Sequence, residues 1–403
     1  MTNGSVAEAI LNQLRLWGVK RIYGVVGDAI FGLTDAIAKQ DDIRFISVKH
    51  ESVAAFMASA EAKCTGQLAV CAAQMGPGLA NLLNGLGDAY MDGYPVLAIT
   101  GQAPLPAIGT GYKQFVNQQQ LAAALTGYSQ LVAHPDAIVD ALSEAIHASV
   151  TNRTASHLSV PSDLFAMPTN GRPREPLRCV PGDPAPADVE RALQLMRSAK
   201  RPMILVGRQA RRAAAEIERL ALAWGSGVAN AYGATGAIAD DFQLALGGLG
   251  EGGNPELSGL FRQADAVAAI GTSWWPEGHT PQQARIVRIA YGEGELGRGA
   301  PADCGLIGDV ASIVARLADA LTGYAPDSAW LEPIRQCKRA WAARNETEGS
   351  NAAFPLHPSR IVRAMERHAS PDAIIALDEG DSTVWFMRNF RAKRQLVLLS
   401  GQW

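Results

Sequence analysis

The chain has 403 residues, of which 48% are hydrophobic and 19% are charged, and its formal net charge at pH 7 is −3. This length predicts about two or three domains, and the small net charge argues against nucleic acid or an acidic membrane surface as a partner. No apolar run is long enough for a membrane span, and the N-terminus lacks the basic start and apolar block of a signal peptide, so we expect a cytoplasmic protein.

Short apolar strands alternate with helices over residues 1–168. Helices are predicted at 5–17, 30–39, 51–65 and 78–91, and strands at 21–27, 43–48, 68–73 and 95–100. This alternation is typical of a parallel sheet with helices on both faces, which binds ligands at the carboxyl ends of its strands. Cys64 and Cys71 lie in Ala-rich runs that predict core positions, and the five cysteines lack the CxxC spacing of a zinc site or disulfide framework.

Two further segments follow a Pro- and Gly-rich linker at 168–187. The second segment, 188–323, contains predicted strands at 202–207, 227–232, 264–271, 284–290 and 304–308, with helices at 209–224 and 309–322. The third segment, 355–403, contains a helix from about 358, a strand at 373–378, a second helix and a terminal apolar strand. We therefore expect an α/β protein of three consecutive doubly wound parallel-sheet domains.

The third predicted domain is too short to be complete. Two strands cannot bury both faces of a sheet, so we expect this domain to be truncated. The terminal strand is expected to expose an apolar edge around Val397 to Leu399 and to make the chain prone to associate.

Glu51 lies where the apolar strand "FISV" passes into the helix at 51–65, directly after His50. An acid in the first turn of a helix interacts favourably with unpaired backbone N–H groups and with the helix dipole, so a helix-end acid is one interpretation. Its place at the carboxyl end of a parallel strand also fits a functional carboxyl group. The neighbouring motifs must decide between the two.

The segment after the third predicted strand contains Gly76, Pro77 and Gly78 at a strand-to-helix connection. Glycines there allow a ligand to approach the backbone, although GPG alone also forms ordinary turns. The ordered set is more specific, because Asn81, the triplet "NGL", Asp92 and the strand end "ITGQ" follow in turn.

Together with "HES" at 50–52, this set resembles the pyrimidine-binding domain of thiamine diphosphate enzymes, in the group of acetolactate synthase, pyruvate oxidase and quinone-dependent pyruvate dehydrogenase. The stretches "GVKRIYGVVGDAIFGLTDAI", "LVGRQARRAAAEIERLA" and "IIALDEGDSTVW" extend the resemblance over nearly the whole chain. It implies thiamine diphosphate and Mg²⁺ as cofactors and a 2-oxo acid as the small-molecule substrate. It also implies a homodimer or homotetramer whose active sites lie between subunits.

The resemblance gives Glu51 a role in activating the cofactor. Its carboxyl group would hydrogen-bond the pyrimidine ring and favour an imino tautomer, which removes the C2 proton of the thiazolium; burial would help the carboxyl group to hold the shared proton. Pro77 and Asn81 would line the pyrimidine pocket, with Gly27 and Asp28 facing the substrate. Otherwise Asn81 is a capping or surface amide, and Gly27 and Asp28 form an ordinary turn.

Gln114, in "GYKQFVNQQQL", falls at the active-site glutamine of the family, whose side chain would contact the substrate-derived intermediate. The relatives read Phe-Gln-Glu here, whereas this chain has Lys113, Gln114 and Phe115. The sequence therefore departs from the family pattern on both sides of this glutamine.

The third segment resembles the start of a diphosphate-binding domain, with Gly380, Asp381 and Ser382 at the first loop that touches the diphosphate. The alternative is an acidic turn before a helix. The loop that holds Mg²⁺ in the family would lie beyond Trp403, so no metal ligand is predicted here. We accordingly expect the 403-residue chain alone to lack decarboxylase activity.

The central domain binds flavin in part of the family. Gly207, Ala210 and Arg211 fall at the flavin-contacting loop, and residues 247–255 are rich in glycine. Arg211 could bond a diphosphate through its fork of donors, or it could be a solvated arginine on a helix surface. The strand at 284–290 lacks the Ile-Asp-x-Asp-Pro ending of flavin-binding relatives, which argues against FAD.

The sequence thus predicts thiamine diphosphate-dependent decarboxylation of pyruvate or a similar 2-oxo acid, most like that of pyruvate oxidase or pyruvate dehydrogenase. Acetolactate synthase, which transfers the acyl group to a second 2-oxo acid, is the alternative. A catalytically silent fragment or half-site subunit is an alternative of another class.

Overall fold

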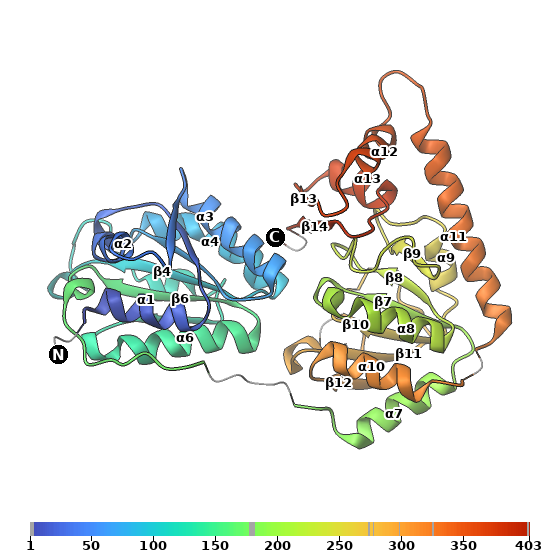
Figure 1. The fold of residues 1–403 in the computed structure, drawn as a ribbon, viewed down its shortest axis with the longest axis horizontal. Helices are drawn as coiled ribbons and strands as arrows, with labels where there is room; N and C mark the ends of the chain where they lie inside the picture. The colour runs from blue at the N-terminus through green and yellow to red at the C-terminus, as the bar shows by residue number, and fades with distance from the viewer. Residues whose placement is uncertain are drawn as a thin grey trace. The chain divides into compact units, whose positions relative to one another are not determined.

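The computed structural model describes residues 4–176, 182–272, 275–276, 278–297, 299–324, 326–400 and 403. The chain divides into two compact units, residues 1–179 with 402–403 and residues 180–401 (Figure 1). Among the described residues, no helix combines the length and apolar character needed to cross a bilayer.

The first unit is built on a six-stranded parallel sheet with the strand order β2-β1-β3-β4-β6-β5. Its strands are β1 (Arg21–Gly24), β2 (Arg44–Ser47), β3 (Ala69–Ala73), β4 (Val96–Gln102), β5 (Tyr128–Leu131) and β6 (Ala155–Pro161). Strands β3, β4 and β6 are buried along their whole length, as expected for a parallel sheet covered on both faces.

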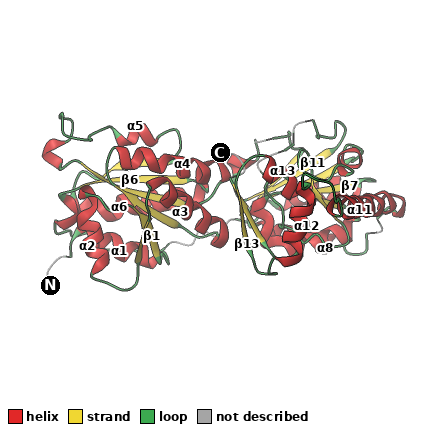
Figure 2. Cartoon of the chain, turned by 90° about the horizontal axis from the view of Figure 1, so that it is seen from above, coloured by secondary structure: helices red, strands yellow, loops and turns green. Residues whose placement is uncertain are grey.

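Helices cover both faces of this sheet (Figure 2). They are α1 (Val6–Leu16), α2 (Phe31–Ala38), α3 (Glu51–Thr65), α4 (Pro77–Asp92), α5 (Gln118–Ala122) and α6 (Ile138–Asn152). Val70 belongs to the core under α1, α2 and α6, whereas its neighbour Cys71 belongs to the core under α3 and α4. The alternation of side chains along β3 therefore separates two apolar cores.

Local sequence signals account for the ends of these helices. Ser5 begins α1 with a capping box, in which its Oγ accepts from the backbone N–H of Glu8 at 3.2 Å and the Glu8 carboxylate accepts from the backbone N–H of Ser5 at 2.7 Å. Helix α3 ends at Gly66, whose φ of 65° lies in the left-handed region. Cys71 is buried as predicted, but the core prediction for Cys64 is wrong, because this residue lies on the exposed side of α3. Cys179 lies outside the described residues.

The second unit contains another six-stranded parallel sheet, with the order β12-β11-β10-β7-β8-β9. Its strands are β7 (Pro202–Val206), β8 (Gly227–Asn230), β9 (Ala245–Gly248), β10 (Ala266–Ile270), β11 (Arg285–Ala290) and β12 (Cys304–Ile307). Numbered within the unit, this order is 3-2-1-4-5-6, that of dinucleotide-binding folds. Its helices are α7 (Pro186–Arg197), α8 (Ala214–Trp224), α9 (Leu257–Phe261), α10 (Val310–Ala320) and α11 (Ser328–Gly349).

The third segment up to residue 401 belongs to this second unit and contains a small sheet of two parallel strands. Its elements are α12 (Pro358–His368), β13 (Ile374–Leu377), α13 (Asp381–Asn389) and β14 (Leu396–Leu399). The expected apolar edge at 397–399 is not observed, because Val397 and Leu399 are each only 5% exposed; Ile374 on β13 is instead 63% exposed. The α/β class and the parallel sheets are confirmed, with two large sheets and one small third sheet.

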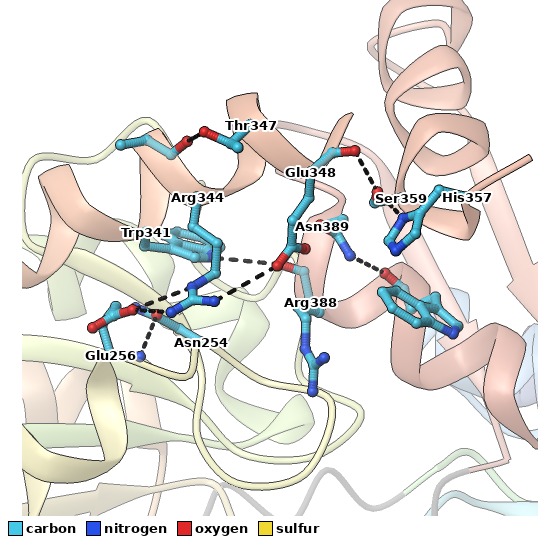
Figure 3. Close-up of polar contacts among 12 residues, drawn as sticks. Asn254, Glu256, Trp341, Arg344, Thr347, Glu348, His357, Ser359, Arg388 and Asn389 are labelled. Atoms are coloured by element: carbon cyan, nitrogen blue, oxygen red, sulfur yellow. Dashed lines mark hydrogen bonds and ion pairs between the residues drawn. The ribbon is translucent and has the colours of Figure 1, made fainter. Parts of the chain in front are cut away.

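Helix α11 connects the large sheet of this unit to the third segment (Figure 3). Arg344 pairs with Glu256, with an Nη2 to Oε1 distance of 2.6 Å, and Trp341 Nε1 donates to the carbonyl of Arg388 at 3.2 Å. Ser359 Oγ donates to the carbonyl of Glu348 at 2.8 Å. These side-chain contacts hold α12 and α13 against the second sheet.

Candidate active site

Glu51 is the first residue of α3 and lies at the carboxyl edge of the first sheet. His50 precedes it as the N-cap in an extended conformation, and its Nδ1 accepts from the backbone N–H of Ser52 at 3.3 Å. Asn81 on α4 donates its Nδ2 to Oε2 of Glu51 at 2.9 Å. Within the described part of the chain the half-buried Glu51 carboxyl group has no other hydrogen-bond partner, so its Oε1 is available to a donor.

Close packing of α3 on α4 brings Glu51 and Asn81 together. A Cβ atom at Gly85 would lie 2.5 Å from the backbone nitrogen of Phe56 and 2.6 Å from the Cβ of Ala55, so this helix crossing requires glycine. The facing side of α3 is a row of small buried residues, namely Ala54, Ala55, Ala58, Ser59 and Ala62.

A buried charge cluster stabilises the same pair of helices. Lys63 Nζ lies 2.8 Å from both carboxylate oxygens of Asp88 and 2.7 Å from Oδ2 of Asp92. The three side chains are 7%, 3% and 0% exposed, and Ser59 also donates to Asp88. Asp92 was part of the sequence motif, whereas Lys63 and Asp88 were missed. Two acids four residues apart on α4 are the signal that could have indicated a buried cation on the facing helix.

A second polar cluster follows strands β1 and β3. Gln74, directly after β3, donates its Nε2 to Asp28 and, at 3.0 Å, to Oε1 of Gln114. Its Oε1 accepts from the backbone N–H of Ala29 at 2.8 Å. Lys113 Nζ donates to Asp28 at 3.0 Å, and this contact lowers the pKa of the Asp28 carboxyl group. Asp28 is therefore an anion near neutral pH.

Glycines make this arrangement of amides possible. A Cβ atom at Gly27 would lie 2.8 Å from Oε1 of Gln74. Gly76 has a φ of 56°, and a Cβ atom there would lie 2.3 Å from the carbonyl oxygen of Gln114. Gln114 itself has a φ of 59°, which non-glycine residues rarely adopt, so its backbone is held in a specific conformation.

The two clusters meet at the loop before α4, where Gly76 is the N-cap and Pro77 is the first helical residue. The strand order changes direction between β1 and β3, and ligands of open α/β sheets bind at such a point. The structure thus brings Gly27, Asp28 and Gln114 into one cluster and Glu51 and Asn81 into another at the same edge. Gln74 was missed, although a polar residue directly after a buried strand in "AAQMGPG" is a recognisable signal.

The predicted flavin-contacting residues lie after β7 in the second unit. A Cβ atom at Gly207 would be 2.1 Å from the carbonyl oxygen of Gly271, and Ala210 is fully buried. Arg211 Nη2 donates to the carbonyl of Gln395 in the third segment at 2.8 Å. These residues therefore make close contacts within the protein.

The glycine-rich stretch at 247–255 makes similar contacts. Gly247 has a φ of 76°, and a Cβ atom there would lie 2.7 Å from the indole of Trp341. A Cβ atom at Gly253 would lie 2.1 Å from the carbonyl oxygen of Gly248. Protein atoms therefore lie close to the Cβ positions of these glycines, and the flavin site stays a prediction.

The predicted diphosphate loop is exposed at the start of α13. Gly380 has a φ of 120° with open space around its Cβ position, and Asp381 and Ser382 follow as the first two helical residues. Tyr232 Oη donates to the Glu379 carboxylate at 3.0 Å; burial and this contact raise the pKa of Tyr232 to about 12. The described residues contain no group of three His, Cys, Asp or Glu side chains that could hold a metal ion.

Comparisons with known proteins identify two domains. Residues 4–121 match the N-terminal TPP binding domain of thiamine pyrophosphate enzymes, and residues 189–317 match the central domain of these enzymes. The catabolic acetolactate synthase of Raoultella terrigena is 30% identical, over 98% of this chain and 73% of that enzyme. Pyruvate oxidase of Lactiplantibacillus plantarum is 29% identical, over 98% of this chain and 66% of that enzyme. An uncharacterised 42.6 kDa protein of Pseudomonas amyloderamosa is 34% identical, over 82% of this chain and 85% of that protein.

Proposed function

Because the chain belongs to the thiamine pyrophosphate enzyme family, we propose that its first unit binds the pyrimidine half of thiamine diphosphate and that, in an assembly that also binds Mg²⁺ and the diphosphate, it takes part in the decarboxylation of pyruvate or a similar 2-oxo acid in the cytoplasm. The observation that carries this proposal is the Glu51 carboxyl group. Asn81 holds one of its oxygens at 2.9 Å, and the other oxygen is available to a donor on a ligand.

The site residues then have separate roles toward the cofactor and the substrate. Thiamine diphosphate, when bound, supplies the nucleophilic carbon that attacks the carbonyl group of the 2-oxo acid. Glu51 would hold the shared proton at a pyrimidine ring nitrogen, and Pro77 and Asn81 would line that ring. Gln114 and the charged pair of Asp28 and Lys113 would face the substrate, where the ammonium group of Lys113 would attract an anionic 2-oxo acid and the Asp28 carboxylate would offset part of this attraction.

Mg²⁺ and the diphosphate belong to the same proposal. Backbone N–H groups at the start of α13, near Gly380, Asp381 and Ser382, suit an anion such as a diphosphate. Because the described part of the chain contains no group of three His, Cys, Asp or Glu side chains that could hold a metal ion, we assign no metal ligand. Flavin in the second unit stays a prediction: a yellow purified protein whose flavin binds more weakly after Arg211→Ala would support it, and a colourless protein that takes up no flavin would argue against it.

Thiamine diphosphate binding tests the proposal. Titration of the full chain by calorimetry with Mg²⁺ present should detect binding, and Glu51→Gln should weaken it about tenfold or more, because a hydrogen bond to a charged group contributes about 1.5–3 kcal/mol. Glu61→Gln, on the same helix but paired with Arg21, is the matched control and should bind like the wild type. Equal affinity of the wild type and Glu51→Gln would refute the role of Glu51.

Acetolactate synthesis is the second candidate, supported by the 30% identity to the Raoultella terrigena enzyme. Product analysis with pyruvate as the sole substrate separates the two reactions, since only acyl transfer to a second pyruvate gives acetolactate. A chain that binds thiamine diphosphate without turnover would instead be a half-site subunit. Sedimentation analysis tests the proposed homodimer or homotetramer.

A further inference from the structure

Gln74 makes hydrogen bonds to three groups of the candidate active site. Its Oε1 accepts from the backbone N–H of Ala29 at 2.8 Å, and its Nε2 donates to the carboxylate of Asp28 and to Oε1 of Gln114. A Cβ atom at Gly27 would lie 2.8 Å from the Gln74 amide oxygen, so the glycine keeps space for this amide. Gln74 is therefore held in place on both of its polar atoms.

These partners determine which way the Gln74 amide points. A backbone N–H can only donate, and an ionised carboxylate can only accept. Lys113 lowers the pKa of Asp28, which keeps the carboxyl group of Asp28 ionised. Turning the Gln74 amide over would place its oxygen against this carboxylate and its NH2 group against the N–H of Ala29. The NH2 group of Gln74 must consequently face Gln114.

The orientation of Gln74 in turn fixes that of Gln114. Because Gln114 Oε1 accepts from Gln74 at 3.0 Å, its Nε2 points away from Gln74 with both N–H donors. In the described part of the chain the Gln114 side chain has no other hydrogen-bond partner. Its backbone cannot readily turn, since its φ is 59° and its carbonyl oxygen lies against Gly76. Two N–H donors in a fixed position suit an oxygen acceptor, above all a carboxylate.

We propose that Gln74 is a positioning residue that makes Gln114 a hydrogen-bond donor to the carboxylate or carbonyl oxygen of the 2-oxo acid. This inference rests on the proposed function, because it assumes that Gln114 faces the substrate. Gln74 acts through Gln114 and does not contact the substrate itself. The N–H of Ala29 and the carboxylate of Asp28 fix which end of the Gln74 amide donates and which accepts. Gln74 in turn leaves the N–H donors of Gln114 free to face the substrate.

Gln74→Glu removes the NH2 group that donates to Gln114 and so should reverse the orientation of the Gln114 amide. A glutamate can still accept from the N–H of Ala29, but an ionised glutamate has no donor for Gln114, and the single O–H of a protonated one would go to Asp28. Gln114 would then turn its NH2 group toward residue 74 and its oxygen toward the substrate. We expect the affinity for pyruvate to fall about tenfold or more, because the substrate oxygen would meet an acceptor.

The double variant Asp28→Asn/Gln74→Glu separates positioning from structural damage. An asparagine at position 28 donates to the carboxylate introduced at position 74 and removes the repulsion between two carboxylates, yet Gln114 stays reversed. If Gln74 served only to stabilise the loop, pyruvate binding would recover in the double variant. The proposal expects no recovery.

The experiment uses the full chain labelled with ¹⁵N in glutamine side chains and titrated with pyruvate without thiamine diphosphate, so that no turnover occurs. The Gln114 side-chain amide should shift in the wild type and not in Gln74→Glu at the same pyruvate concentrations. Unchanged affinity in Gln74→Glu, recovery in the double variant, or no response of Gln114 in the wild type would each overturn the inference. Calorimetry with thiamine diphosphate and Mg²⁺ judges the proposed function separately, because Gln74→Glu should leave that affinity within about twofold.

Discussion

Asp240 offers a test of the contact between the second sheet and the third segment. This residue lies between β8 and β9, and its Oδ2 accepts from the backbone N–H of Ala392 at 2.8 Å. Its own backbone N–H donates to the carbonyl of Ala392 at 2.7 Å. Its Oδ1 is buried without a hydrogen-bond partner in the described part of the chain. The third segment therefore packs on a carboxyl group of which only one oxygen accepts a hydrogen bond from the described residues.

Burial raises the pKa of Asp240 to about 7, from an ordinary value of 3.8. The hydrogen bond from Ala392 and the charges of Lys338 and Arg391 lower this pKa, and the charge of Glu366 raises it. The folded protein thus keeps a proton that the unfolded chain releases above about pH 4, so stability is lost as the pH rises from about 4 to about 7. At about 1.4 kcal/mol for each pH unit, the loss reaches about 4 kcal/mol.

Asp240→Asn should remove this pH dependence. The asparagine still accepts from the N–H of Ala392, and its buried NH2 group costs about 1–3 kcal/mol equally at every pH. Hydrogen exchange of a peptide spanning 386–395, corrected for the intrinsic exchange rate, gives the opening free energy. We expect that free energy to fall between pH 5 and pH 8 in the wild type and to stay level in Asp240→Asn.

The neighbouring Asp241 is exposed, so Asp241→Asn is the matched control and should keep the wild-type slope. If the opening free energy changed with pH in the same way in the wild type and in Asp240→Asn, the reasoning would be refuted, since Asp240 would then not retain its proton near neutral pH.

Two further substitutions test packing and buried charge. Lys63→Met leaves two buried aspartates without their cation and should reduce the free energy of unfolding in urea by about 3–5 kcal/mol. Its control, Lys39→Met at an exposed ion pair, should change this free energy by less than about 1 kcal/mol. Gly247 has a φ of 76° and a Cβ position 2.7 Å from Trp341, so Gly247→Ala should destabilise the second unit by about 1–3 kcal/mol. Its control, Gly294→Ala, places the added methyl group in open space and should have little effect. If either variant and its control unfolded at the same urea concentration, the corresponding expectation would be contradicted.

The periodicity of the sequence predicted most elements but not their ends. The strand predicted at 21–27 stops at Gly24, because the chain turns into the loop that carries Gly27 and Asp28. The helix predicted at 209–224 begins as a 3₁₀ helix at Arg208–Ala213, where the backbone packs against Gly271. Strands β5 and β6 and helix α6 of the first unit were not predicted. Strand β9 was not predicted either, since two of its four residues are glycines and pairing with β8 forms it.

The candidate site was predictable where its chemistry is local in sequence. Glu51 and Asn81 each lie in the first two turns of a helix that follows a strand, so the helix packing brings them together. The contacts of Gln74 with Asp28 and of Arg211 with Gln395 join residues 46 and 184 positions apart. Such partners depend on how the strands are ordered and on which loops meet, and strand periodicity contains no information on either.

The glycines of the site illustrate how a correct pattern can have an indirect cause. Gly76 was expected to let a ligand approach the backbone and Gly27 to face the substrate, and both expectations stay predictions. In the structure the nearest groups are protein atoms, because Gly27 makes room for the Gln74 amide and Gly76 for the Gln114 carbonyl oxygen. A glycine motif therefore reports that the backbone is crowded without telling what crowds it. Here the crowding fixes two amides, and the amides rather than the glycines would determine what the site recognises.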